Sequence, residues 1–95
     1  MAIGITVQFT IQEGSNEAFE AGFAKASAVV KEQDEGCEMY DLFRSVDDPN
    51  RYVMVESWAS EEDLEAHKTS AAMGEVGKAI GGFIAGAPVM HQYEA

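Results

Sequence analysis

The sequence predicts an α+β fold of the ferredoxin-like type, in which a four-stranded antiparallel sheet carries its helices on one face. Three observations predict it. Residues 2–12 alternate apolar and polar side chains, as a half-buried strand does. Residues 16–35 repeat apolar side chains at helical spacing. The remaining residues give two strands joined by a tight turn, then a helix and a last strand. Strand, helix, strand, strand, helix, strand is the order of two split βαβ units, and right-handed crossovers leave few other arrangements.

The first strand has two different faces. Its apolar face consists of Ile3, Ile5, Val7, Phe9 and Ile11. Its other face carries small or uncharged side chains, among them Thr6 and Gln8, and no charge precedes Glu13. A lone sheet of this kind would expose that second face, and an uncharged surface is better covered by another subunit than left in solvent. We therefore expect a homodimer in which two sheets meet face to face.

The first helix is predicted over residues 16–35, or about five turns at ~3.6 residues each. Gly14 and Ser15 supply the turn and cap before it, and Gly36 is placed to end it. Its apolar face is formed by Phe19, Gly22, Phe23, Ala26, Val29 and Val30. Charged side chains occupy the opposite face, so the helix is amphipathic.

A hairpin follows the first helix. Residues 37–46 form its first strand, and the third strand of the sheet begins at Arg51. Residues 47–50, Asp-Asp-Pro-Asn, form the turn, because proline sets its own φ while Asp and Asn bond to nearby backbone. Cys37 is the only cysteine, which excludes an internal disulfide and fits a reducing cytoplasm. We interpret it as a small buried residue rather than a nucleophile.

Residues 51–67 are the most site-like stretch. A strand runs to Trp58, and Ser60 then caps a helix whose first turn holds three acids, which suits the positive end of the helix dipole. Leu64 and His67 are three residues apart and share a face of this helix. Leu64 should face the core, so His67 should point inward too. A buried histidine is either a satisfied core residue or part of a site, and this pattern leaves both readings open.

The last third of the chain predicts a further helical segment and a final strand. Ser70 can cap the segment, and Gly81-Gly82 ends it. Its apolar stripe is expected at Met73, at either Val76 or Gly77, and at Ile80. The glycines of this helix either allow close packing on a neighbour or leave room for a ligand. Residues 87–93 form the fourth strand, entered through Pro88.

Composition and charge exclude several classes of function. The net charge of −11 argues against a nucleic-acid backbone or an anionic membrane surface as partner. No apolar run reaches membrane-spanning length, and the N-terminus lacks the basic region of a signal peptide, so we expect a cytoplasmic protein. His67 and His91 lack the spacing of metal ligands, so no metal is expected.

The chain resembles the antibiotic biosynthesis monooxygenase superfamily in an ordered set of short motifs: Glu35-Gly36-Cys37 followed by Tyr40, Asp48-Pro49, Glu56-Ser57-Trp58-Ala59-Ser60, and Leu64-Glu65-Ala66-His67 with Ser70. The resemblance covers residues 1–95 as a single domain. It implies a dimeric α+β barrel, and an enzyme that oxidises a quinol or another hydroxylated aromatic molecule with dioxygen and no metal or flavin. A deprotonated, electron-rich phenol can itself pass an electron to oxygen, so the protein need supply only a base, hydrogen-bond donors and a dry cavity.

The resemblance also implies a set of site residues. His67 would hold or deprotonate the phenolic hydroxyl, Tyr40 and Trp58 would donate hydrogen bonds to the substrate, and Glu56 would orient His67. The apolar walls would be Phe9, Phe43, Met54, Met73 and Phe83.

Other readings of the same residues stay open. A non-catalytic small-molecule-binding dimer and an isomerase with His67 as proton shuttle are the alternative functions. Arg44 is expected to pair with a carboxylate rather than to anchor a substrate oxygen. Gly77 stands where haem-degrading members of the superfamily carry a haem-ligating histidine, which argues against haem degradation.

Overall fold

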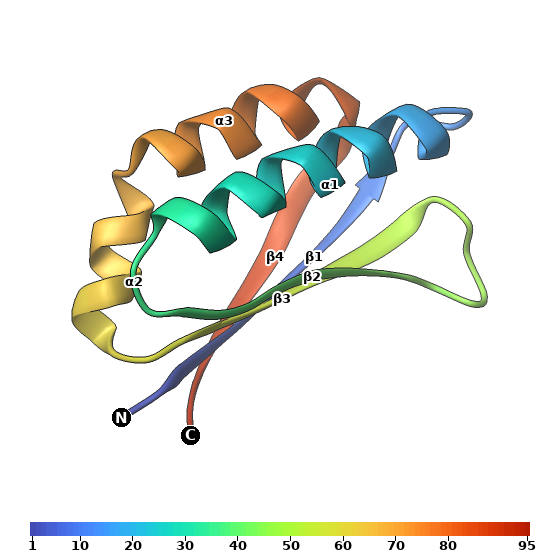
Figure 1. Ribbon diagram of the computed structural model, residues 1–95. Coiled ribbons are helices and arrows are strands. Elements are labelled where there is room, and N and C mark those ends of the chain that lie inside the picture. The colour runs from blue at the N-terminus through green and yellow to red at the C-terminus, as the bar shows by residue number, and fades with distance from the viewer.

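The computed structural model describes residues 1–95, and its elements follow the predicted order (Figure 1). They are β1 (Ile3–Ile11), α1 (Asn16–Gln33), β2 (Cys37–Arg44), β3 (Arg51–Trp58), α2 (Glu61–Lys68), α3 (Ala71–Ile80), the short 3₁₀ helix η1 (Gly81–Phe83) and β4 (Ile84–Glu94). The strands lie in the order β2-β3-β1-β4 and every neighbouring pair is antiparallel. All helices lie on one side of the sheet, as Figure 1 shows. The predicted ferredoxin-like α+β fold is confirmed.

The core lies between the helices and one face of the sheet. Alternate residues of β1 and β3 are buried there, including Ile5 and Phe9 of β1 and Met54 and Trp58 of β3. This follows from the two-residue period of a strand, which sends successive side chains to opposite faces. The predicted inner face of α1 is confirmed at Phe19, Phe23, Ala26 and Val30. None of the helices is both long and apolar enough to span a membrane.

Two of the three predicted serine caps form, whereas the side chain of Ser15 makes no capping hydrogen bond to α1. Ser60 Oγ accepts a hydrogen bond from the amide of Asp63, and Ser70 Oγ accepts one from the amide of Met73. α1 ends at Gln33, two residues before the predicted end, and the chain then turns at Gly36 with a φ of +82°. A side chain at Gly36 would be strained and would also overlap the side chain of Asp63.

The predicted apolar stripe of α3 is partly wrong, because the helix is rotated toward α1. Its buried residues are Ala72 and Val76, one position before Met73 and Gly77. Gly22 of α1 is the residue that permits close packing, since a Cβ there would lie 3.1 Å from the carbonyl oxygen of Ala79. The chief partner of α3 is therefore α1 and not the sheet.

β4 is longer than the predicted 87–93 and begins at Ile84. Pro88 lies inside the strand, at an irregularity in the pairing with β1: Gln8 pairs with Val89 whereas Thr10 pairs with Ala85. A bulge leaves residues unpaired, so a proline without an amide hydrogen costs no ladder bond there.

The face of the sheet that carries no helix is uncharged over most of its area. Register and strand period place on it Thr6 and Gln8 of β1, Val53 and Val55 of β3, and their paired neighbours on the outer strands. Several large apolar side chains here are exposed, namely Met39, Phe43, Val89 and Tyr93. The uncharged character expected for this face from Thr6 and Gln8 thus extends to parts of all four strands, with Asp41 of β2, opposite Val55, as a charged exception.

Candidate functional site

His67 lies in the interior, as the spacing of α2 predicts. Its side chain is 3% exposed. The indole of Trp58 stacks on the imidazole with ring centres 4.4 Å apart, and the ring of Tyr40 meets it edge-on at 5.4 Å. Phe23 stacks in turn on Tyr40 at 5.9 Å. The imidazole therefore sits in an aromatic cage formed by Tyr40 of β2 and Trp58 of β3, and Phe23 of α1 supports the Tyr40 ring from behind.

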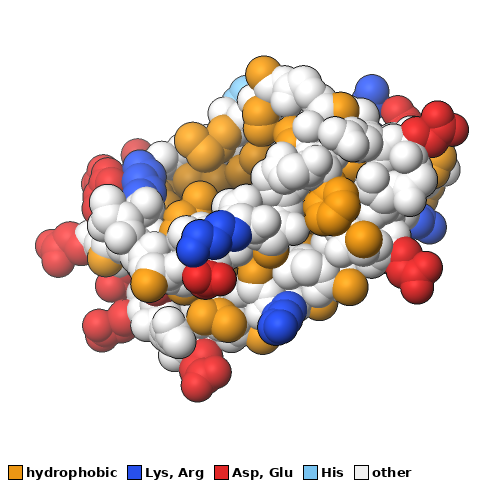
Figure 2. All heavy atoms as spheres, turned by 90° about the horizontal axis from the view of Figure 1, so that it is seen from above, with side chains coloured by type: hydrophobic (Ala, Val, Ile, Leu, Met, Phe, Trp, Pro, Cys, Tyr) orange, Lys and Arg blue, Asp and Glu red, His pale blue; other side chains and the backbone are white.

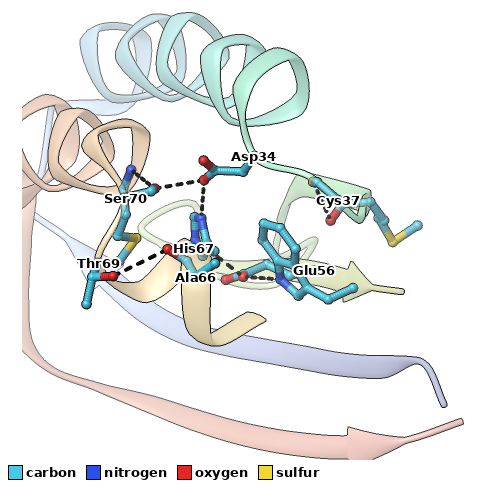
Figure 3. A network of polar contacts seen from close by, with 10 residues as sticks. Asp34, Cys37, Glu56, Ala66, His67, Thr69 and Ser70 are labelled. Carbon is cyan, nitrogen blue, oxygen red and sulfur yellow. Dashed lines mark hydrogen bonds and ion pairs between the residues drawn. The ribbon is translucent and has the colours of Figure 1, made fainter. Parts of the chain in front are cut away.

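A carboxylate that the sequence analysis did not identify holds one nitrogen of this imidazole. Asp34 is the residue that follows α1, and its Oδ2 lies 2.6 Å from His67 Nδ1. The same Oδ2 accepts a hydrogen bond of 2.8 Å from Ser70 Oγ, which also caps α3. Figure 3 shows the three side chains converging from the ends of three helices. We call Asp34, His67 and Ser70 the helix-end triad.

Glu56 faces the other imidazole nitrogen, Nε2, but at a greater distance. Its Oε1 is 3.9 Å from His67 Nε2, beyond hydrogen-bond distance. The same oxygen accepts a hydrogen bond of 3.0 Å from Trp58 Nε1 (Figure 3). Burial raises the pKa of Glu56, although the Trp58 hydrogen bond and the charge of His67 lower it in part. Glu56 is thus near the position expected for an orienting group, while Asp34 makes the close contact. The indole hydrogen of Trp58, expected to reach a substrate, is bonded to Glu56 instead.

Tyr40 brings an unpaired hydroxyl to the same region. Its side chain is fully buried, and its phenolic oxygen has no hydrogen-bond partner. Burial is the largest cause that raises the pKa of Tyr40, and the neighbouring Glu56 raises that pKa further. Buried polar groups are nearly always hydrogen-bonded, so an unpaired hydroxyl beside the imidazole is a candidate donor to a bound molecule.

The expected apolar walls do not form one cavity. Phe9 and Met54 are buried in the core, where Phe9 packs edge-on against Phe19. Phe43 is on the opposite face of the sheet from His67, because it is an odd number of residues from Tyr40 along the same strand. Its expected role as a wall is wrong. Met73 and Phe83 remain partly exposed on α3 and η1.

A groove does open on the helix side, between α3 and β4. Met73, Gly77 and Ile80 share one face of α3, while the charged pair Glu75–Lys78 marks the solvent face. Ile80 packs on the core, so the face it shares with Met73 and Gly77 is turned toward the sheet. The surface of the sheet beneath this face of α3 is exposed. Met90 of β4, which pairs with Val7 of β1, is 60% exposed.

We call this space the α3–β4 groove, defined by Val7, Met73, Gly77, Ile80 and Met90. Figure 2, seen from the helix side, shows a hollow with apolar walls beside α3. A Cβ at Gly77 would meet no atom within 4 Å. Of the two readings of the glycines of α3, close packing on a neighbour therefore does not apply to Gly77.

A second pocket, of about 410 Å³, lies between α1 and β2 and is charged at its rim. Arg44 lies 3.5 Å from Glu20 there, and Lys31 lies 3.0 Å from Asp41. The expectation that Arg44 pairs with a carboxylate is confirmed. Because Arg44 and Lys31 each form an ion pair with a carboxylate, the rim of the pocket offers no unpaired cation to a ligand.

Sequence reasoning missed Asp34 for a physical reason. It lies 33 residues from His67 along the chain, and the pair forms only when α1 and α2 end at the same place. The available signal was weak: an acid two residues before Gly36, in the last turn of the predicted helix. No group of three or more His, Cys, Asp or Glu side chains is arranged to hold a metal ion.

Comparison with known proteins places these residues in a wider context. Residues 2–79 match the family model of the antibiotic biosynthesis monooxygenases. A Caulobacter crescentus protein assigned to that group has 32% sequence identity and a TM-score of 0.91, over 99% of this chain and 89% of that one. A Bordetella bronchiseptica protein with the same assignment has 28% identity and a TM-score of 0.87, over 99% and 96%.

A third structure shares the fold at lower identity. SnoaB of Streptomyces nogalater, a cofactor-independent oxygenase, has 19% identity and a TM-score of 0.85, over 99% of this chain and 92% of that one. No curated protein matches the chain.

Proposed function

The chain belongs to the antibiotic biosynthesis monooxygenase family, and we propose that it is a monooxygenase that oxidises a quinol or a related hydroxylated aromatic molecule with dioxygen and without a cofactor. The observation that carries this proposal is a histidine base prepared inside an aromatic cage. His67 has one nitrogen held by a carboxylate at 2.6 Å and the other free of any hydrogen bond. SnoaB, described as a cofactor-independent oxygenase, has the same fold and supports the absence of a cofactor.

The proposed chemistry uses His67 Nε2 as general base. Removing the phenolic proton makes the ring electron-rich enough to give an electron to dioxygen, and a water-poor site keeps the resulting radical pair from side reactions. One oxygen atom then enters the ring, and the other leaves as water. A hydroquinone becomes a hydroxyquinone in this way, so the substrate supplies all the electrons and no external reductant is needed.

The α3–β4 groove is the proposed binding site for the aromatic ring. It has the apolar surface that such a ring needs, and Met73 at its edge donates its amide hydrogen to Ser70 of the helix-end triad. His67 is nearly closed off in this structure, so substrate entry requires α2 to move relative to the groove. The buried hydroxyl of Tyr40 would then gain the partner that it lacks.

We also propose a homodimer formed by the open faces of two sheets. The exposed Met39 and Phe43 of β2 and the exposed Val89 and Tyr93 of β4 support it, because large apolar side chains left exposed at both edges of one face suggest a protein interface. The single free cysteine, Cys37, supports a reducing compartment such as the cytoplasm.

A second candidate function is a non-catalytic small-molecule-binding dimer. The 3% exposure of His67 favours it, because the helix-end triad then serves only to fix the ends of α1, α2 and α3. Ligand affinity without oxygen consumption would identify this function.

Oxygen uptake tests the proposal directly. The metal-stripped protein is assayed with a panel of small hydroquinones, beside His67→Ala and beside Glu65→Ala, an exposed position on the same helix. We expect uptake above the autoxidation rate, a loss of about 10²–10⁴-fold in His67→Ala, and no change in Glu65→Ala. Equal activity in the two variants would remove His67 from the chemistry. No uptake with any member of the panel would favour the binding protein.

A further inference from the structure

We propose that Asp34 is a positioning residue for His67: its carboxylate keeps the imidazole hydrogen on Nδ1 and leaves the lone pair of Nε2 free to accept a proton from the substrate. The proposal deepens the proposed function, because it states how the base of that reaction is prepared. It concerns a residue that does not touch the substrate.

The contacts of Asp34 define which nitrogen carries the hydrogen. Its Oδ2 faces His67 Nδ1 at 2.6 Å. A carboxylate can only accept hydrogen bonds, so the nitrogen that faces it must donate one. A neutral imidazole has a single N–H, and the other nitrogen is then an acceptor. The geometry therefore makes Nε2 the basic atom.

Glu56 is the other carboxylate that could accept the imidazole hydrogen, but its position is less favourable. Its Oε1 is 3.9 Å from Nε2 and is already engaged by the indole hydrogen of Trp58. The two carboxylates thus differ in their distance to the imidazole, 2.6 Å for Asp34 and 3.9 Å for Glu56, and this difference favours a hydrogen on Nδ1.

Asp34 is also held rigidly enough to position another side chain. Its backbone amide donates to the carbonyl of Val30 at the end of α1, and its Oδ2 accepts from Ser70 Oγ. The side chain of Asp34 is 10% exposed, so water competes little for the carboxylate. One oxygen atom therefore joins the end of α1 to α2 and to the first turn of α3.

The nitrogen-15 spectrum of the imidazoles tests this assignment. The chain has two histidines, so a His91→Gln sample identifies the signals of His67. We expect the wild-type protein to show a protonated Nδ1 and an unprotonated Nε2 at neutral pH. In Asp34→Ala the hydrogen should move to Nε2, the side of Glu56. In Glu56→Gln it should stay on Nδ1.

Ser70→Ala is the matched structural control. It removes one bond of the helix-end triad and the cap of α3, so it should lower the melting temperature without moving the hydrogen from Nδ1. Should Asp34→Ala fail to fold, Asp34→Asn keeps the shape of the side chain. The neutral amide should then let part of the population carry the hydrogen on Nε2.

The kinetic readout separates positioning from structure. We expect Asp34→Ala to lower kcat by about 10²-fold or more with KM changed only a few-fold, since the substrate does not touch Asp34. A wild-type imidazole with its hydrogen on Nε2, or with both nitrogens protonated at neutral pH, would overturn the proposal. So would an Asp34→Ala protein that moves the hydrogen yet keeps full kcat. The spectrum needs no substrate, so a failure of the monooxygenase assignment would leave the test of Asp34 intact.

Discussion

At the scale of single residues, two buried tyrosines show how a hydrogen-bond partner determines whether a buried hydroxyl stabilises the fold. Tyr52 donates to Glu20 Oε2 at 2.5 Å and accepts from Asn16 Nδ2 at 2.9 Å. Tyr40 is equally buried and has no partner. A paired hydroxyl stabilises a fold modestly, whereas an unpaired buried one destabilises it.

We therefore expect opposite results from the same substitution. Tyr52→Phe should lower the free energy of unfolding by about 1–2 kcal/mol, and Tyr40→Phe should leave it unchanged or raise it by up to about 1 kcal/mol. Urea denaturation of the three proteins at one pH measures both effects. A loss in Tyr40→Phe as large as that in Tyr52→Phe would mean that the Tyr40 hydroxyl has a partner in solution.

The buried carboxylate of Glu56 predicts a pH dependence. Burial raises the pKa of Glu56 above its ordinary 4.5, so the native protein binds this proton more tightly than the unfolded chain does. Stability is thereby lost as the pH rises from 4.5 through the raised pKa, and the loss is complete above it.

Glu56→Gln isolates this effect, because glutamine can still accept from Trp58 but cannot ionise. The difference in unfolding free energy, variant minus wild type, should increase with pH across that window and then level off. Chemical denaturation of both proteins between acidic and neutral pH gives the difference, in which the other carboxylates cancel. A difference independent of pH would show that Glu56 titrates alike in the folded and unfolded states.

At the scale of elements, the molecule is organised by where the helices end. α1, α2 and α3 bring Asp34, His67 and Ser70 together only because each helix stops at a defined residue. The cap at Ser70 defines the start of α3, whereas the cap at Ser60 defines the opposite end of α2. The packing of α1 against α3 then determines which side of α3 faces the groove.

Two helical glycines test that packing. Gly22 approaches the backbone of α3, and Gly74 has open space around it. Gly74→Ala should raise the free energy of unfolding by about 0.5–1 kcal/mol, through helix propensity alone. Gly22→Ala gains the same propensity, but its Cβ would press on the carbonyl oxygen of Ala79 at 3.1 Å, so we expect a net loss of about 1 kcal/mol. Thermal and urea denaturation compare the pair. Equal gains in the free energy of unfolding would show that α1 and α3 can move apart at little cost in free energy.

At the scale of the whole molecule, the sheet has one face covered by helices and one face that carries no helix (Figure 1). Met39, Phe43, Val89 and Tyr93 are exposed on the second face. The proposed homodimer would cover the open face. Val55 lies near its centre, paired with Thr6 on one side and Asp41 on the other.

A charge at that position should prevent association. We expect the wild-type protein to sediment as a dimer at micromolar concentration and Val55→Glu to sediment as a monomer, because a glutamate there would be desolvated beside the carboxylate of Asp41. Glu65→Lys, an exposed change of larger charge on α2, is the control and should stay dimeric. A monomeric wild-type protein would contradict the dimer.

The sequence by itself determined the order of the elements, the caps of α2 and α3, the hairpin turn and the inward direction of His67. These follow from local rules: strand period, helix period, and the backbone preferences of Gly, Pro, Ser and Asp. Only the tertiary structure decided which carboxylate meets the imidazole, which face of α3 is buried, and that Phe43 lies across the sheet from His67. Those features depend on where helices and strands that are distant in the sequence end, and on how they are oriented against one another. Asp34 and His67 are 33 residues apart, and no local pattern encodes their contact.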